Sequence, residues 1–295
     1  MDVSVIVPFR DTETYIEDCV RALLAQAHPT DDVEIILVDN DSRDRSAEIV
    51  RRYSQIKLLS EHEPGAYAAR NRGIAEARGD ILAFTDPDCV PCANWLEQLT
   101  AAVRRPGVGI VMGRQQFASD SPILAMLEAY ETEKATHVFS GNVKEVYFGH
   151  TNNLAVRRKL FDRCGPFRQI ARGADTIFVR LAVDEYGCSI ARYCPEACVR
   201  HLELASVWDY YRKQLIYGRS NRDNAQIAAY RPLTNRERLR VLRHTARRRS
   251  YSVREVALLS CLLGVGAICY GIGRRRPIRR GSSLMSNTIR EAGSG

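Results

Sequence analysis

Short apolar runs alternate with stretches of helical periodicity through the first 110 residues of the chain. Five apolar runs predict strands: Ser4–Val7, Glu34–Val38, Lys57–Leu59, Ile81–Phe84 and Gly109–Met112. Four amphipathic stretches between them predict helices: Tyr15–Gln26, Ser46–Tyr53, Tyr67–Ala77 and Trp95–Val103. This alternation predicts an α/β domain with a parallel sheet, right-handed crossovers and helices on both faces.

Acidic residues follow three of the predicted strands at the points where the strands end. Phe9-Arg10-Asp11 follows the first strand, Asp39-Asn40-Asp41 the second and Thr85-Asp86-Pro87-Asp88 the fourth. A single Asp at such a position is ordinarily a turn former or a helix N-cap. Ligands of open α/β sheets bind beyond the carboxyl ends of the strands. Three acidic ends at one rim repel each other unless a cation or a polyol separates them, so we expect a divalent metal or a sugar-like ligand there.

Two phosphate-binding motifs do not occur in the chain. No G-x-G-x-x-G follows the first strand, and there is no G-x-x-x-x-G-K-[ST]. If a diphosphate binds, a metal must therefore hold it, and Asp86-Pro87-Asp88 suits that role because Pro87 fixes the turn. The same segment also fits an aspartyl-phosphate phosphatase, in which Asp86 would be the nucleophile.

Four motifs, in order and at regular spacing, resemble family 2 of the inverting nucleotide-sugar glycosyltransferases, which have the GT-A fold. The motifs are Val3-Ser-Val-Ile-Val-Pro-Phe-Arg-Asp11, Val33-Glu-Ile-Ile-Leu-Val-Asp-Asn-Asp-Ser-Arg-Asp44, Gly65-Ala-Tyr-Ala-Ala-Arg-Asn-Arg-Gly73 and Asp86-Pro-Asp88. The resemblance covers about residues 1–220 and implies a Rossmann-like, mixed but mainly parallel sheet. It further implies a nucleotide-sugar donor, a hydroxyl acceptor and a Mn²⁺ or Mg²⁺ cofactor, with UDP as the usual nucleotide.

The resemblance also implies a role for each motif residue. Pro8 and Asp11 are expected to lie beside the nucleotide, and Asp39 to accept hydrogen bonds from its base. The remaining residues are expected to meet other parts of the donor: Arg70 the base or diphosphate, Asp86 the ribose and Asp88 the metal.

The second half of the chain continues the resemblance. Phe148-Gly-His-Thr-Asn-Asn-Leu-Ala-Val-Arg-Arg158 is similar to the family segment that lines the donor sugar and acceptor, which assigns His150, Thr151, Asn152 and Asn153 to that pocket. Asp175 inherits the role of general base. Ala174 stands where the family usually has Glu. Asp175 also fits a simple cap of a helix that begins at Thr176, and a scaffold protein without turnover remains an alternative function.

Two cationic side chains further along are weaker candidates. His201 resembles a family position that joins the metal or diphosphate, although a lone His is usually satisfied locally. Arg219, in Tyr217-Gly-Arg-Ser220, resembles a family Arg that reaches the diphosphate.

The net charge of +8 is distributed unevenly. Residues 231–295 contain fifteen Arg, no Lys and three acidic residues, a net of +12, so the first 230 residues carry a net of −4. An acidic body with a basic tail favours a membrane-surface anchor over a nucleic-acid groove, because only Tyr251 interleaves the first Arg run. We therefore expect no nucleic-acid partner.

Nine cysteines and the first residues of the chain bear on its compartment. The spacings Cys89-Val-Pro-Cys92 and Cys194-Pro-Glu-Ala-Cys198 permit a four-Cys zinc site, but free thiols fit better. The first eight residues do not form a signal peptide, because they have no basic segment and too short an apolar run. We expect the body to lie in the reducing cytosol.

The sequence predicts two parts: a GT-A domain at 1–230 and a basic helical tail at 231–295. The tail contains an uncharged segment, Val256–Ile272, between Arg clusters that include Arg254 and Arg274. Its 17 residues span about 25 Å as a helix, slightly less than a ~30 Å hydrocarbon core. We expect a protein at the cytoplasmic side of the membrane, attached peripherally or by one inserted helix. A helix packed on the body is the alternative.

Overall fold

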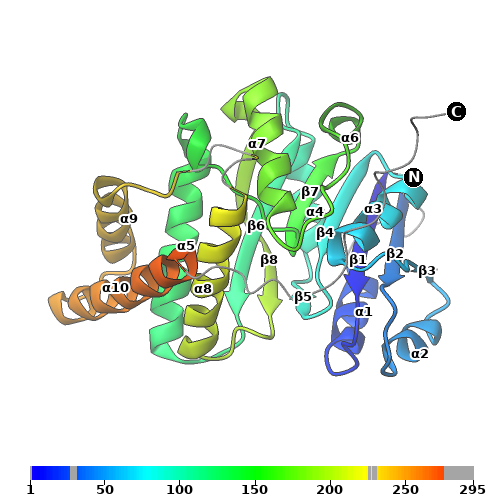
Figure 1. Ribbon diagram of the computed structural model, residues 1–295, viewed down its shortest axis with the longest axis horizontal. Helices are drawn as coiled ribbons and strands as arrows, with labels where there is room; N and C mark the ends of the chain where they lie inside the picture. Colours follow the sequence, from blue (N-terminus) through cyan, green and yellow to red (C-terminus); the bar gives the residue numbers. More distant parts are fainter. Residues whose placement is uncertain (1, 27–31, 225–226, 228–230, 276–295) are drawn as a thin grey trace, which may run out of the picture.

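The computed structural model contains one sheet with helices on both of its faces (Figure 1) and describes residues 2–26, 32–224, 227 and 231–275. Its eight strands lie in the order β3-β2-β1-β4-β7-β6-β8-β5. The strands are β1 Val3–Phe9, β2 Val33–Asp39, β3 Ile56–Ser60, β4 Ile81–Thr85, β5 Cys89–Pro91, β6 Ile110–Phe117, β7 Asn153–Arg157 and β8 Ala191–His201. The α-helices are α1 Ile16–Leu24, α2 Ser46–Arg51, α3 Ala66–Glu76, α4 Trp95–Val103, α5 Pro122–Ser140, α6 Lys159–Cys164, α7 Ala174–Tyr186, α8 Val207–Asp223, α9 Asn235–Arg248 and α10 Val253–Arg275.

The sequence of β1 builds a hydrophobic core on each face of the sheet. Successive side chains of a strand point to opposite faces. Val3, Val5 and Val7 join the cluster that contains residues of α1, α2 and α4, whereas Ile6 joins the cluster with residues of α3, α5 and α7. A strand buried on both faces reads as a continuous apolar run, which is why the sequence located β1, β2 and β4.

The sheet is mixed but mainly parallel, as the family resemblance implied. β1, β2, β3 and β4 pair in parallel, and β6 pairs in parallel with β8. The five strands expected from the first 110 residues, β1 to β4 and β6, run in one direction, so that expectation is confirmed. β7 runs antiparallel between β4 and β6, and β5 runs antiparallel at the edge against β8. β7 comes from a distant part of the chain, so no local pattern could reveal its insertion.

The connection between β4 and β5 requires the sheet to curl. In the strand order β5 lies four positions from β4, which in a flat sheet would be about 19 Å. Only three residues, 86–88, join the two strands, and from Thr85 to Cys89 the chain reaches at most about 14 Å. The edge of the sheet therefore curls back towards its centre, with Asp86-Pro87-Asp88 at the point of closure.

The C-terminal helices pack on the rest of the molecule. Phe117, Leu127 and Tyr210 form a third hydrophobic cluster with Val241 of α9 and Leu259 of α10. α9 and α10 share this core with α5 and α8. One face of α10 therefore packs on the body, as the alternative to a membrane helix predicted. The boundary at residue 230 stays a prediction.

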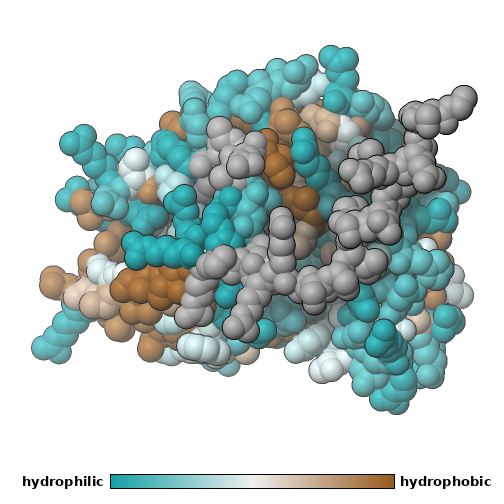
Figure 2. Space-filling view, in the orientation of Figure 1, coloured by the Kyte–Doolittle hydropathy of each residue, from teal (hydrophilic) through white to brown (hydrophobic). Residues whose placement is uncertain are grey.

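The opposite face of α10 is exposed. Figure 2 shows hydrophobic surface at the lower left, over α10, and its exposed apolar side chains are Val253, Leu258, Val265, Ile268 and Ile272. Among the described residues, α10 is the one helix long and apolar enough to cross a membrane. It has 23 residues, about 34 Å, and so exceeds the predicted segment at both ends. Arg276 and the residues after it lie outside the described residues.

Candidate functional site

A cavity of about 1070 Å³ opens beyond the carboxyl ends of β1 and β4. Most residues that the sequence assigned to a site line it: Pro8, Asp11, Arg70, Asp86, Asp88, His150, Thr151, Asn152, Asp175 and His201. Three assigned residues are not among its lining residues: Asp39, Asn153 and Arg219. The cavity thus brings together residues from all four N-terminal motifs and from the segment that begins at Phe148.

The loops after β1 and β2 are tied together at the cavity. Asp11 has a φ of +50°, a left-handed conformation that Asp tolerates better than most residues. Its Oδ1 accepts a hydrogen bond from the backbone N–H of Arg43 at 2.7 Å, and its own N–H donates to Ser42 Oγ. Asp39 accepts from the N–H of Ser42, so its carboxylate closes the turn after β2. The Asp39 carboxylate has the local turn-forming role that the sequence left open.

Arg70 and Asp86 form a partly buried ion pair on the cavity wall. Arg70 Nη2 lies 2.5 Å from Asp86 Oδ1, and only 5% of the Arg70 side chain is exposed. The guanidinium carbon also lies 5.2 Å from the ring centre of Tyr67, within cation–π range. Arg70 comes from α3 and Asp86 from the end of β4, so the pair fixes the first carboxylate of the Asp86-Pro87-Asp88 turn.

Asp88 and His201 bring together two side chains that could hold a divalent cation. β5 pairs with β8 so that Cys89 opposes His201, which brings the turn beside the imidazole. Asp88 Oδ2 lies 3.5 Å from His201 Nδ1, and this buried nitrogen has no hydrogen-bond partner. Burial and the nearby Lys213 lower the pKa of His201 to about 4, so the ring is neutral at pH 7, the form that binds metals. An unsatisfied ring nitrogen that faces a buried carboxylate fits a divalent cation.

The Cys89 thiol is the third potential ligand near this site, and the sequence indicated it only as part of a four-Cys zinc site. The ligand atoms of Asp88, Cys89 and His201 all lie within 4.8 Å of one another. Burial raises the pKa of the Cys89 thiol well above its usual range, and Cys89 does not line the cavity. A thiol must lose its proton to bind a metal, so the two cavity-facing residues fit better. Burial, followed by the charge of Asp86, also raises the pKa of Asp88 to about 6.

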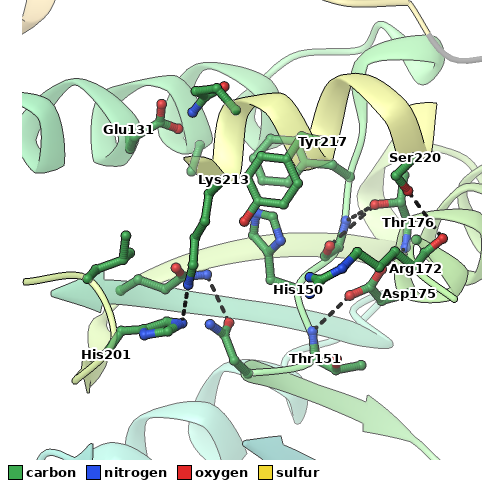
Figure 3. Close-up of a pocket in the computed structure, with 18 of the residues that line it drawn as sticks. Glu131, His150, Thr151, Arg172, Asp175, Thr176, His201, Lys213, Tyr217 and Ser220 are labelled. Carbon is green, nitrogen blue, oxygen red and sulfur yellow. Dashed lines mark hydrogen bonds between the residues drawn. The ribbon is translucent and has the colours of Figure 1, made fainter. Parts of the chain in front are cut away.

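Asp175 faces the cavity from the first turn of α7. Its Oδ2 accepts from the N–H of Thr151 at 3.1 Å and its Oδ1 from the N–H of Thr176 at 2.8 Å. Gly173, with a φ of +90°, occupies the N-cap position, so Asp175 is not the cap of a helix that begins at Thr176. A carboxylate has about four lone-pair sites, so two remain for a substrate hydroxyl. Figure 3 shows Asp175 beside Thr151 and opposite Tyr217 and His150.

The other pocket residues divide into lining and supporting roles. His150 and Tyr217 lie 6.1 Å apart between their ring centres, and burial lowers the pKa of His150. Asn153 is fully buried and supports the wall, because it accepts from Trp95 Nε1 and donates to the carbonyls of Arg114 and Ala197. Ala174 is buried in the hydrophobic cluster with Phe178. The Ala174 side chain therefore does not line the cavity.

Lys213 on α8 is a cation of the cavity that was not predicted from the sequence. Lys213 lines the cavity and its Nζ lies 2.7 Å from His201 Nε2, whereas Arg219 on the same helix is exposed. Lys213 lies one helical turn before Tyr217, the first residue of the segment whose Arg219 resembles a family Arg that reaches the diphosphate. The i, i+4 spacing from that segment was the available signal. The cavity also extends to Leu239, Leu242 and Leu263 of α9 and α10.

All nine cysteines are free thiols, as expected from the sequence. The four-Cys zinc site does not form, because the one cluster of three or more potential ligands found in the described part of the chain is Asp88, Cys89 and His201.

Comparison with known sequences gives a family match and several relatives. The model described as glycosyl transferase family 2 matches residues 4–178. Glycosyltransferase AglE of Haloferax volcanii is 32% identical over 188 residues, which is 62% of this chain and 61% of that protein. The uncharacterized glycosyltransferase EpsJ of Bacillus subtilis is 36% identical over 113 residues, 37% of this chain and 32% of that protein. The alignments thus span about three fifths or less of these relatives.

Solved structures share the fold. A mannosyltransferase, PcManGT from Pyrobaculum calidifontis, in complex with GDP-Man and Mn²⁺, has a TM-score of 0.63 at 20% identity over 92% of this chain and 83% of that one. TarS 1–349 of S. aureus, in complex with UDP-GlcNAc, has a TM-score of 0.52 at 18% identity over 92% and 82% of the chains. At this level of sequence identity, the likeness shows that these proteins share the GT-A fold, and nothing more.

Proposed function

Because the chain belongs to glycosyl transferase family 2, we propose that it is an inverting glycosyltransferase that moves a sugar from a nucleotide-sugar donor to a hydroxyl acceptor. The observation that carries this proposal is the cavity itself. The Asp86-Pro87-Asp88 turn, His201 and Asp175 all line it, together with Pro8, Asp11 and Arg70 of the N-terminal motifs. The proposed metal ligands, the residues proposed to contact the nucleotide and the proposed general base thus face the same cavity.

Each group has a definite part in the transfer. Asp88 and His201 would hold Mn²⁺ or Mg²⁺, and a bound cation would supply stabilisation of negative charge on the diphosphate. Arg70 keeps the Asp86 carboxylate fixed, and the fixed carboxylate binds the ribose hydroxyls. Asp175 takes the proton from the acceptor hydroxyl as its oxygen attacks the anomeric carbon, and attack opposite to the leaving group inverts the configuration. The N–H groups of Thr151 and Thr176 hold the carboxylate for that step.

Two alternative functions are less consistent with these observations. An aspartyl-phosphate phosphatase needs Asp86 as a nucleophile, but its Oδ1 is engaged by Arg70 at 2.5 Å, and the family match gives no support to that enzyme class. The hypothesis of a scaffold protein without turnover was based on Ala174 alone. The buried position of Ala174 leaves the Asp175 carboxylate in the cavity, so loss of the family Glu does not remove the base.

The tail supports a peripheral location on the cytoplasmic face of a membrane. One face of α10 is apolar and exposed, but the other packs on α8, which carries charged residues such as Asp209 and Arg212. A bilayer cannot surround a helix with that neighbour at low cost, so α10 lies in the interface instead of spanning. Arg274 and Arg275 at its end favour an anionic surface.

The acceptor then enters from the membrane side. The cavity that begins at the Asp86-Pro87-Asp88 turn is lined at its other end by Leu239 and Leu242 of α9 and by Leu263 and Ala267 of α10. A hydroxyl acceptor on an apolar carrier fits this change from polar to apolar lining. A glycolipid or a lipid-linked glycan has that chemistry, which agrees with a role in cell-envelope or polysaccharide synthesis.

A thermal-shift panel tests the proposed function. UDP, GDP and their sugar conjugates are added with and without Mn²⁺, because a ligand that binds the native state alone raises the unfolding temperature. We expect a shift with one of the two nucleotides that depends on Mn²⁺. Incubation with the selected nucleotide sugar should then release nucleoside diphosphate, whereas a phosphatase would release inorganic phosphate. No shift with any nucleotide contradicts the proposal.

A further inference from the structure

Three side chains form a row at the metal end of the cavity: Asp88, His201 and Lys213. Asp88 Oδ2 lies 3.5 Å from His201 Nδ1, and the Lys213 ammonium lies 2.7 Å from His201 Nε2 on the other side of the ring. Figure 3 shows Lys213 reaching down from α8 to the imidazole. The contact joins α8, which packs on the C-terminal helix α10, to the end of β8.

The hydrogen bond between Lys213 and His201 fixes the position of the ring proton. An ammonium has three donors and no acceptor, so Nε2 must accept with its lone pair. A neutral imidazole then carries its proton on Nδ1, the nitrogen that faces Asp88. A divalent cation held between Asp88 and His201 needs the Nδ1 lone pair, which moves the proton to Nε2. That nitrogen and the ammonium would then be two donors face to face.

Binding of the cation through the other ring nitrogen leads to the same exclusion. The Lys213 Nζ would have to leave the position beside Nε2, because the cation and the ammonium both need the same lone pair. Whichever ring nitrogen of His201 binds the divalent cation, the hydrogen bond from Lys213 to the ring cannot form at the same time.

Charges around the turn explain why Lys213 lies there. Asp86 is paired with Arg70, whereas among the described residues Asp88 has only the neutral His201 within ion-pair distance. The Lys213 charge lies close enough to favour the ionised form of Asp88. A divalent cation at Asp88 would supply this positive charge itself and would repel the ammonium.

We propose that the Lys213 ammonium holds the place of the divalent cation at His201 and moves to the diphosphate of the donor when the cation binds. The inference rests on the proposed function and adds a residue to it. A diphosphate brings at least two negative charges to the metal, and Lys213 is a flexible cation within reach of that point. Arg70 is already held by Asp86, and Arg219 is outside the cavity. Lys213 therefore makes binding of metal and of nucleotide depend on each other.

This exchange predicts opposite effects on two binding equilibria. Without nucleotide, the ammonium competes with the metal, so its removal should tighten binding of Mn²⁺ alone. With Mn²⁺ bound, the ammonium is a ligand of the diphosphate, so its removal should weaken nucleotide binding. A residue that merely supports the fold would not tighten one equilibrium while weakening the other.

The test measures both equilibria in the full chain. Binding of Mn²⁺ alone is followed by the paramagnetic resonance signal of free Mn²⁺, and binding of UDP and of GDP at saturating Mn²⁺ by calorimetry. The variants are Lys213→Gln and Lys213→Met, with Arg212→Gln as the control, since Arg212 is an exposed cation on the same helix. We expect the Lys213 variants to bind Mn²⁺ more tightly and the nucleotide about tenfold or more weakly, the usual value of a charge-assisted hydrogen bond. Arg212→Gln should match wild type.

The outcomes separate this inference from the proposed function. If wild type binds Mn²⁺ and nucleotide but both Lys213 variants bind both ligands as wild type does, the exchange is overturned and the proposed function stands. Weaker nucleotide binding with unchanged or weaker Mn²⁺ binding also overturns it, since no competition is then relieved. If wild type binds neither Mn²⁺ nor either nucleotide, the proposed function fails first.

Discussion

The backbone of Gly218 on α8 lies directly against that of Tyr270 on α10. A Cβ at position 218 would lie 2.1 Å from the carbonyl oxygen of Tyr270, and one at Gly273 would lie equally close to the carbonyl of Leu215. At these two glycines the backbones of the helices therefore meet with no side chain between them. Because α8 also carries Lys213 and Tyr217, the C-terminal helix holds one wall of the cavity.

Gly218→Ala should separate these helices. The clashing atoms are backbone, so the helices must move apart, and overpacking of this kind costs about 1–3 kcal/mol. We expect a lower urea midpoint of unfolding. The control is Gly264→Ala, where a Cβ meets nothing within 4 Å and should be neutral or stabilising, since Ala is the better helix former. Equal midpoints for the two variants would argue against close packing of α8 and α10.

Asp175→Asn should separate catalysis from binding. The amide keeps the shape of the side chain but cannot take the proton of the acceptor hydroxyl. We expect turnover to fall by about 10²–10⁴-fold, the range for a positioned general base, with donor affinity nearly unchanged. Steady-state rates and calorimetry on the same samples measure the two effects. Wild-type turnover in this variant would remove Asp175 from the mechanism.

The start of α9 should lose stability in acid. Glu237 binds Arg231 through both oxygens and caps the helix with Thr234, and the Arg231 hydrogen bond is the main cause that lowers the pKa of Glu237 from 4.5 to about 2. A carboxyl with a depressed pKa in the folded state stabilises the fold above pH 4.5, and this contribution disappears as the pH falls through about 2.

The variant Glu237→Gln isolates this contribution. We expect it to be less stable than wild type at pH 6, and the difference in free energy of unfolding to shrink as the pH falls from 4.5 towards 2. Urea denaturation at several pH values measures it. A difference that stays constant over this range would mean that the ion pair does not stabilise the fold.

The exposed face of α10 should bind membranes. Ile268 is 64% exposed on this face, so a charge there opposes insertion into the lipid interface without disturbing the core. We expect Ile268→Glu to reduce co-sedimentation with anionic vesicles by about tenfold. Val143→Glu adds the same charge at a residue that is 38% exposed outside α10, and it should sediment as wild type does. Equal binding of all three proteins would contradict the membrane proposal.

The sequence identified the parts of the site that depend on local patterns. Apolar runs located β1, β2 and β4, and the acidic residues at their ends gave Asp11, Asp86 and Asp88. Long-range pairing was not predictable. The antiparallel position of β7 makes Asn153 a support for Trp95 instead of a pocket residue.

The roles of α8 and α10 were hidden for the same physical reason. Nothing in the sequence near Lys213 shows that α8 points it at His201, because the packing of α10 on α8 sets that orientation. The apolar segment in the tail predicted a membrane helix, but glycines along it also permit backbone contact, and the sequence alone could not divide its faces between protein and lipid.

Calorimetric titration of nucleoside diphosphate into wild type and Asp88→Asn, each with and without Mn²⁺, tests the central claim most directly. Asp88 is the carboxylate that faces His201 in the cavity, and the amide removes its charge with little change of shape. The account predicts that Mn²⁺ strengthens binding of UDP or GDP to wild type, and that this gain is lost in Asp88→Asn while its unfolding midpoint stays close to that of wild type. Binding that depends on Mn²⁺ equally in both proteins would contradict it.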